Sequence, residues 1–213
     1  LVVRYPDVEV NPGTRTARVL CSNIRGLYGN LHDLSVAASS YDLVLCSETL
    51  VSGHRHSSEL AVPYFGRPVL RLHDPAVRGS RGLAAFVREG RCVSRQRTFE
   101  CKCCEFMVMR VCGSVRNFYI FSVYRSPSID NKIFDCLMEA MASIQSCDGK
   151  SCFLFVGDFN AHHVEFGSRR TDHSGQVAVD FMSESGCEQL VREPTHIHGG
   201  TLDLLFTDVP ELV

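Results

Sequence analysis

The chain has 213 residues, of which 45% are hydrophobic and 22% charged, a composition typical of one folded domain with a substantial core. No apolar stretch reaches the roughly 18 uncharged residues that a membrane span requires. The apolar start of the chain is also too short for the core of a signal peptide. The sequence therefore predicts an intracellular protein, nuclear or cytoplasmic, that is neither secreted nor inserted in a membrane.

The formal net charge is −2, from 22 basic and 24 acidic residues. This balance excludes a strongly basic domain that would attract nucleic acid through its overall field. Arginine is nevertheless dense between residues 67 and 97. An enzyme that holds DNA through a metal ion and a few local arginines can be globally neutral, but such a run is more often a solvated face.

Eleven cysteines are present, an odd number. Five lie in apolar runs, where a free thiol behaves as a small hydrophobe and indicates a reducing compartment: Cys21, Cys46, Cys112, Cys136 and Cys152. The cluster Cys101-Lys102-Cys103-Cys104 would need a second pair of ligands to hold zinc, and none follows in a short loop. We therefore expect Cys103 and Cys104 to begin a strand.

Apolar runs of strand length recur along the chain, and most are continuous enough for buried strands. They lie at residues 18–22, 43–46, 83–87, 106–111, 118–123, 153–156 and 202–206. Three helices are predicted among them: one at about 30–39, one from Asp130 as N-cap to Ile144, and one at 174–185 that Gly186 ends. Strands mixed with helices without strict alternation indicate a layered α/β or α+β sandwich.

Polar residues follow the run 153–156 directly. Asp158 and Asn160 are two residues apart, so their side chains project the same way from the strand end. A carboxylate there can accept a proton from water or hold a metal, and the neutral amide can orient the nucleophile. An ordinary polar turn favours the same residue types, so this segment alone leaves both interpretations open.

Other strand ends carry oxygen ligands too. Asn23 ends the first strand, Glu48 follows the second and Asp203 lies in the last. Active-site residues of layered α/β proteins gather on strand-end loops, so these side chains and Asp158 could converge on one hard cation such as Mg²⁺.

This succession of motifs resembles the endonuclease/exonuclease/phosphatase (DNase I-like) family over residues 17–208. Within that family it is most similar to the endonuclease domain of non-LTR (LINE-type) retrotransposons, of the jockey and chicken-repeat branches. The motifs that carry the resemblance are Ser22-Asn23-Ile24-Arg25-Gly26-Leu27, Ser47-Glu48-Thr49, Val123-Tyr124-Arg125-Ser126-Pro127, Gly157-Asp158-Phe159-Asn160-Ala161-His162 and Thr201-Leu202-Asp203-Leu204. The resemblance implies a four-layer sandwich of two packed mixed β-sheets flanked by helices.

The resemblance also implies roles for individual residues. Glu48 would be the principal ligand of Mg²⁺, with Mn²⁺ as the alternative ion, and Asn23 would lie beside it. Asp158 would activate or position the attacking water, and Asn160 would orient that water or a phosphate oxygen. The remaining candidates are Tyr124 as a phosphate contact, Asp203 as the partner of the catalytic histidine, and Arg125, Thr195 and His162 as substrate-binding residues.

Both ends of the chain differ from the family pattern. Residues 7–13 resemble a 2A-type ribosome-skipping sequence, but Thr14 stands where that pattern has proline, so we expect no skipping. We predict an upstream remnant or linker at 1–16 and the endonuclease domain at 17–213. The family pattern ends in a Ser-Asp-His strand, and the given sequence stops at Val213 without it. We therefore expect the last strand to be missing and the activity of this chain to be impaired.

The implied reaction is hydrolysis of a DNA phosphodiester, leaving a 3′-hydroxyl that primes a fused, downstream reverse transcriptase. Other enzymes of the same fold are alternatives: a phosphoinositide phosphatase, an RNA deadenylase or an abasic-site nuclease. Repair nucleases of the family usually carry Trp near the site, and this chain has none. A decayed retroelement relic without activity is the non-enzymatic alternative.

Overall fold

The computed structural model describes residues 2–4, 8–9, 16–53, 59–74, 79–113, 115–128, 130–196 and 200–213. Most of the 2A-like segment lies outside these residues. The described part of this segment is β2 (Val8–Glu9). It pairs with β3 (Thr16–Ala17) in a small antiparallel ribbon.

Two sheets form the centre of the molecule. The five-stranded sheet has the order β1-β4-β5-β7-β6. Its strands are β1 (Val2–Arg4), β4 (Val19–Asn23), β5 (Leu43–Ser47), β6 (Val69–Arg71) and β7 (Leu83–Val87). The edge strand β1 pairs with β4 although it falls in the segment predicted to precede the domain, so the sheet starts upstream of residue 17.

The six-stranded sheet has the order β12-β13-β11-β10-β9-β8. Its strands are β8 (Val93–Arg95), β9 (Glu105–Cys112), β10 (Asn117–Tyr124), β11 (Ser151–Asp158), β12 (Glu188–Gln189) and β13 (Asp203–Thr207). The central strands β10 and β11 run parallel, as do β4 and β5 in the other sheet, and the remaining pairs are antiparallel. Both sheets are therefore mixed, as the sequence predicted.

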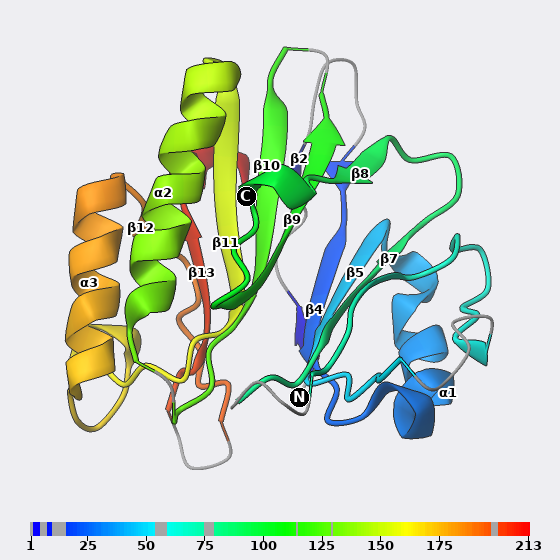
Figure 1. Cartoon of the computed structure of the whole chain (residues 1–213), viewed down its shortest axis with the longest axis horizontal. Coiled ribbons are helices and arrows are strands. Elements are labelled where there is room, and N and C mark those ends of the chain that lie inside the picture. The colour runs from blue at the N-terminus through cyan, green and yellow to red at the C-terminus, as the bar shows by residue number, and fades with distance from the viewer. Residues whose placement is uncertain are drawn as a thin grey trace.

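Helices cover the outer faces of both sheets (Figure 1). α2 (Lys132–Cys147) and α3 (His173–Ser185) lie on the six-stranded sheet, and α1 (Leu27–Ala37) lies on the five-stranded sheet. Short 3-10 turns complete the chain: η1 (Ala38–Ser40), η3 (Arg97–Phe99), η4 (Val164–Phe166) and η5 (Pro210–Leu212). The predicted four-layer sandwich is confirmed.

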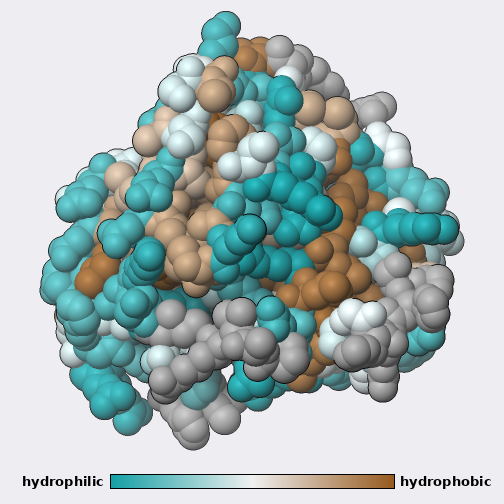
Figure 2. Space-filling model, viewed as in Figure 1, coloured by the Kyte–Doolittle hydropathy of each residue, from teal (hydrophilic) through white to brown (hydrophobic). Residues whose placement is uncertain are grey.

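Three apolar clusters fill the spaces between the four layers. Phenylalanines dominate the cluster under α2 and α3, including Phe121, Phe155 and Phe181, while Leu34 and Phe86 belong to the cluster under α1. The third cluster, between the sheets, is built from alternating strand residues of both. Figure 2 shows hydrophilic side chains predominating over α3. Within the described residues, no helix is both long and apolar enough to cross a bilayer.

Two predicted helix starts were wrong. α1 begins at Leu27, three residues early, because its N-cap is Gly26 at φ 109°, without the polar capping side chain that a sequence pattern would reveal. The N-cap of α2 is Asn131, and Asp130 instead accepts a bond from the backbone N–H of Lys132. α3 follows the prediction more closely, with Asp172 capping Gly175 N–H at 2.7 Å and Gly186 left-handed at its end.

The cysteine predictions hold in part. All eleven cysteines are free thiols. Cys21, Cys46, Cys136 and Cys152 are buried as expected, but Cys112 is exposed because it ends β9 at the edge of the core. Cys103 and Cys104 do not begin a strand, since β9 starts at Glu105.

The parallel pairing of β10 with β11 depends on a glycine. Gly157 has φ 144°, and a Cβ at this position would lie 2.0 Å from the Val123 carbonyl oxygen. We expect Gly157→Ala to lower the free energy of unfolding by on the order of 3 kcal/mol or more, because the backbone of β10 must shift. Gly29, inside α1 with open space around it, is the control; Gly29→Ala should stabilise by about 0.5–1 kcal/mol. Urea unfolding of both variants tests this, and equal stability of Gly157→Ala and the parent would contradict it.

Candidate active site

The candidate site lies where the parallel strands of both sheets end. Asn23 is the last residue of β4, and Glu48 follows β5 directly. Tyr124 ends β10 and Asp158 ends β11 beside it, while Asp203 starts β13 on the other side of Asp158. The two sheets pack with β4 against β11 and β5 against β10, so these five residues meet at one end of the sandwich.

The Asn23 side chain joins the two sheets at this point. Its Nδ2 donates to Glu48 Oε1 at 2.8 Å and to Asp158 Oδ2 at 2.9 Å. Two carboxylates from different sheets therefore lie within hydrogen-bond distance of one nitrogen atom. The Asn23 Oδ1 atom is buried and has no hydrogen-bond partner, which is unusual for a buried polar atom.

Backbone strain accompanies these side chains. Glu48 has φ 51° and Asn160 has φ 46°, both in the left-handed region that non-glycine residues rarely adopt. Bonds from Thr49 N–H to the Gly82 carbonyl and from Leu50 N–H to the Arg81 carbonyl hold the first of these loops. Strain of this kind persists only where the surroundings enforce it, and it concentrates at functional sites.

Burial and like charge raise the pKa values of the acids. Burial, the Asp203 charge and the Glu48 charge raise the pKa of Asp158 to about 7, against bonds from Asn23 and the Asn160 N–H that lower it. The pKa of Asp203 is raised by burial and lowered by its bond with Thr195, and burial with the Glu48 and Asp158 charges raises the pKa of Tyr124. A nearby cation would relieve this crowding of negative charge.

The donor set fits a hard divalent cation. Glu48 offers a carboxylate and Asn23 an unpartnered amide oxygen, and Asp158 lies beside both. Magnesium prefers oxygen ligands of these kinds and retains several waters when only one or two carboxylates contact it. The residues present therefore fit a hard divalent cation, to which Glu48 and Asn23 offer oxygen ligands.

Asn160 and Arg125 form a second, supporting layer. Asn160 Nδ2 donates to the Arg125 carbonyl at 2.8 Å, and its backbone N–H donates to Asp158 Oδ1 at 3.1 Å. The Arg125 side chain is buried, with Nη1 donating to the carbonyls of Phe159 and Asn160 at 3.2 and 3.0 Å. Arg125 was predicted to bind substrate; in the structure its guanidinium instead holds the Asn160 loop against β10 and contacts Ser174.

Thr195 and His162, also predicted to bind substrate, differ in their surroundings. Thr195 is buried, and its Oγ1 accepts from the backbone N–H groups of Leu202 and Asp203 at 2.9 and 3.0 Å. It therefore fixes the start of β13. His162 lies 3.5 Å from Ser168 Oγ through Nδ1, and its backbone pairs with Asp172 at the start of α3.

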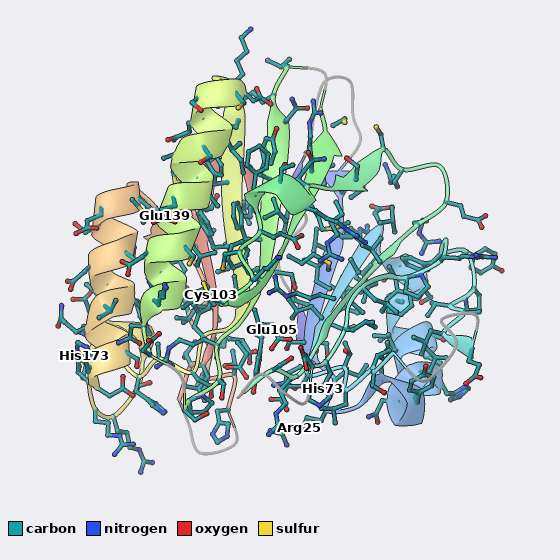
Figure 3. All side chains as sticks on the ribbon, in the orientation of Figure 1. Arg25, His73, Cys103, Glu105, Glu139 and His173 are labelled. Carbon is teal, nitrogen blue, oxygen red and sulfur yellow. The ribbon has the colours of Figure 1, made fainter. Side chains whose placement is uncertain are left out.

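Three residues of the site rim escaped the sequence analysis. Glu105 is a buried carboxylate opposite Tyr124, and it accepts from the backbone N–H groups of Arg81 and Gly82. Arg81 is exposed, and its side chain bonds the Tyr124 phenol. Arg25, also exposed and left-handed at φ 46°, lies close enough to Asp203 to lower its pKa. Figure 3 shows Arg25 and Glu105 toward the same end of the molecule.

Four arginines of the dense segment between residues 67 and 97 have structural roles. Arg88 and Arg91 form ion pairs with Asp42, and Arg71 and Arg95 form ion pairs with Glu100. Among the described arginines of this segment, Arg81 contacts a candidate site residue through a side-chain hydrogen bond to Tyr124. Arg81 differs from the other arginines in its position beside the end of a strand. The density of arginines in the sequence does not distinguish it.

Residues 118–213 match the family model described as endonuclease-reverse transcriptase, and no curated protein matches the sequence. The fold matches the endonuclease domain of TRAS1, a telomere-specific non-LTR retrotransposon, with a TM-score of 0.65 and 19% identity over 89% of this chain and 83% of that one. The chain therefore has the DNase I-like fold of these endonuclease structures.

Two further structures share this endonuclease fold. AP endonuclease LMAP from Leishmania major has a TM-score of 0.68 and 11% identity, over 97% of this chain and 84% of that one. The catalytic domain of APE2 from Xenopus laevis has a TM-score of 0.62 and 12% identity, over 89% and 81%. The predicted family resemblance and DNase I-like fold are confirmed.

The raised pKa of Asp158 makes the stability of the metal-free protein depend on pH. A carboxyl whose pKa is higher folded than unfolded destabilises the protein above its unfolded value of about 3.9. We expect the free energy of unfolding in EDTA to fall as pH rises from about 4 toward the folded pKa of about 7. Asp158→Asn should remove part of this fall, a few kcal/mol at most, since one pKa unit corresponds to about 1.4 kcal/mol.

The control is Asp33→Asn on the exposed side of α1, which should keep the pH dependence of the parent. Urea unfolding at about pH 4 and about pH 8, on either side of the interval in which the free energy of unfolding is expected to fall, provides the comparison. Equal pH dependence in Asp158→Asn and the parent would show that Asp158 does not titrate in this way.

Proposed function

We propose that this chain is a magnesium-dependent DNA endonuclease domain of a non-LTR retrotransposon. The observation that carries the proposal is the Asn23 side chain, which draws Glu48 and Asp158 together and leaves its own oxygen buried and unpartnered. The match of residues 118–213 to the endonuclease-reverse transcriptase family supports the same activity.

Mg²⁺ held by Glu48 and Asn23 would supply positive charge to neutralise a phosphate oxygen as the phosphodiester is cleaved. Asp158 is a buried carboxylate beside Asn23 and Glu48, so it is placed to take a proton from the attacking water. Asn160 is fixed by its bonds to Asp158 and to the Arg125 carbonyl, so its amide can orient that water. Tyr124 can donate its phenolic proton to a phosphate oxygen, since its raised pKa keeps it protonated.

Asp203 and Thr195 act indirectly, by positioning other groups of the site. Thr195 fixes the backbone at Asp203, and Asp203 lies opposite Asp158 in the sheet. We propose that Asp203 orients the catalytic histidine that the family resemblance implies. The cleaved DNA would then offer a 3′-hydroxyl to a reverse transcriptase fused downstream.

The first test is loss of the principal ligand. We expect Glu48→Gln to weaken Mn²⁺ binding and to slow nicking of supercoiled plasmid about 100-fold or more, the usual effect of removing one electrostatic stabiliser. Glu139→Gln, on the exposed side of α2 and labelled in Figure 3, is the matched control and should change neither. Calorimetry with Mn²⁺ gives the affinity, and a gel assay gives the nicking rate.

The two readouts separate the parts of the proposal. Unchanged Mn²⁺ binding in Glu48→Gln would overturn the ligand assignment. Metal binding without nicking, even when a Ser-Asp-His segment is appended to the chain, would overturn the endonuclease activity. Parallel assays on abasic DNA, phosphoinositide and oligoadenylate distinguish the alternatives on the same fold, of which the two AP endonuclease structures favour the first.

The second test concerns DNA contact. Arg25 and Arg81 are exposed cations beside Asp203 and Tyr124, so we propose that they bind phosphates flanking the cleaved bond. Removing one phosphate contact should lower the slope of log affinity against log salt by about 0.9. Lys150→Ala is the control, because Lys150 precedes β11 at the end of the sheet opposite Asp158.

Duplex binding in EDTA, measured by fluorescence anisotropy over a range of salt concentrations, gives these slopes. Arg25→Ala and Arg81→Ala should each flatten the salt dependence, and Lys150→Ala should leave it unchanged. If all three variants lose the same slope, the charges act through the general field of the protein and the proposed contacts are wrong.

A further inference from the structure

A second group of ligating side chains lies away from the carboxylates. Cys101, Cys103 and Cys104 belong to the turn between η3 and β9, and Cys136 lies on α2. One ligand atom from each of the four lies within 4.8 Å of all the others. Figure 3 shows Cys103 beside α2, in the space between this helix and β9.

The distances between the sulfur atoms suit a single tetrahedral ion. Cys103 Sγ lies 3.5 Å from Cys101 Sγ, 3.7 Å from Cys136 Sγ and 3.9 Å from Cys104 Sγ, and the Cys104–Cys136 distance is 3.8 Å. Four thiolates around one zinc ion, each at about 2.3 Å, are separated by roughly 3.8 Å. The same distances are far longer than the roughly 2.05 Å of a disulfide.

The turn is held in this arrangement by an arginine. Arg71 Nη2 donates to the carbonyls of Cys101 and Cys104 at 3.0 and 2.6 Å, and Nη1 donates to the Phe106 carbonyl at 2.7 Å. The backbone is thus fixed without help from the thiols, whose sulfur atoms face one another. The guanidinium also places positive charge beside a group that would be anionic with zinc bound.

Access to the sulfur atoms is open on one side. Cys103 is exposed and Cys101 half-buried, while Cys104 and Cys136 are buried. A cleft lined by Lys102, Cys103, Cys104 and Glu105, among others, reaches the cluster. Soft thiolates bind zinc far better than they bind Mg²⁺, so this group and the carboxylate site would take different ions.

We propose that Cys101, Cys103, Cys104 and Cys136 form a structural zinc site that ties the turn before β9 to helix α2. All four positions of a tetrahedral shell are filled by protein, as in structural and not catalytic zinc sites. Cys104 precedes Glu105, whose carboxylate holds the Arg81 and Gly82 backbone at the active-site rim. The zinc site would therefore also brace that rim.

The test is metal content, with the thiols kept reduced. We expect protein purified with zinc and a reductant to hold one zinc ion per chain by elemental analysis. Replacement by Co²⁺ should give the intense visible bands and thiolate charge-transfer absorption of a tetrahedral tetrathiolate site. Removal of zinc by a chelator should lower the thermal midpoint by several degrees, on the order of 5 °C, since metal that binds only the folded state stabilises it.

Cys103→Ser is the decisive variant, because this thiol is exposed and its loss leaves the buried packing intact. It should bind zinc at least about 10-fold more weakly and lose the tetrathiolate Co²⁺ spectrum. Cys136→Ser should do the same. Cys147→Ser is the matched control on the same helix, exposed and outside the cluster, and should keep full zinc content.

Three outcomes would overturn the site. They are reduced parent protein without stoichiometric zinc after reconstitution, zinc content unchanged by Cys103→Ser, and zinc-free protein in which mass spectrometry finds a disulfide among the four cysteines. Iron in place of zinc, visible from its colour and its analysis, would likewise contradict the assignment. Each readout is independent of DNA cleavage, so the zinc site and the proposed endonuclease activity can fail separately.

Discussion

The structure depends on one constraint at the site: two negatively charged side chains from different sheets are held together by a single amide group. Asn23 can reach both Glu48 and Asp158 only because β4 packs against β11 with the ends of both strands at the same edge. The parallel pairs β4–β5 and β10–β11 fix that edge, and Gly157 allows β11 to approach β10 closely enough. The four-layer architecture thus brings residues that are distant in sequence together at one site.

This arrangement is electrostatically costly without a cation. Asp158 is buried beside Asp203 and Glu48, and its pKa rises to about 7 as a result. The left-handed backbone at Glu48 and Asn160 adds strain at the same place. Neither feature helps the fold, and both suit a site prepared for a divalent ion and a phosphate, since perturbed acids and strained backbone cluster where chemistry occurs. Arg125 and Thr195 form hydrogen bonds with backbone groups beside the site and so help to fix its geometry.

The sequence predicted the site best where polar candidate residues follow a strongly apolar strand. The runs ending at Asn23, Ser47 and Asp158 predicted the strands and the placement of polar residues at their tips. Short strands such as β8 and β12 have too few residues for a recognisable pattern. Arg125 was a substrate-binding candidate through the family resemblance, and only tertiary packing reveals that its side chain is buried. Cys136 was read as a core residue, since its partners are more than thirty positions away and only the packing of α2 against the turn before β9 brings them together.

The central claim is that Glu48 and Asn23 hold one divalent ion beside Asp158. The most direct measurement is anomalous diffraction from crystals of this chain soaked in Mn²⁺. The account predicts an anomalous peak at roughly 2.0–2.3 Å from a Glu48 carboxylate oxygen and from Asn23 Oδ1, with Asn23 still bonded to Asp158 through Nδ2. A fully soaked crystal with no peak there, or with manganese bound elsewhere while the Asn23 oxygen stays without a ligand, would contradict it.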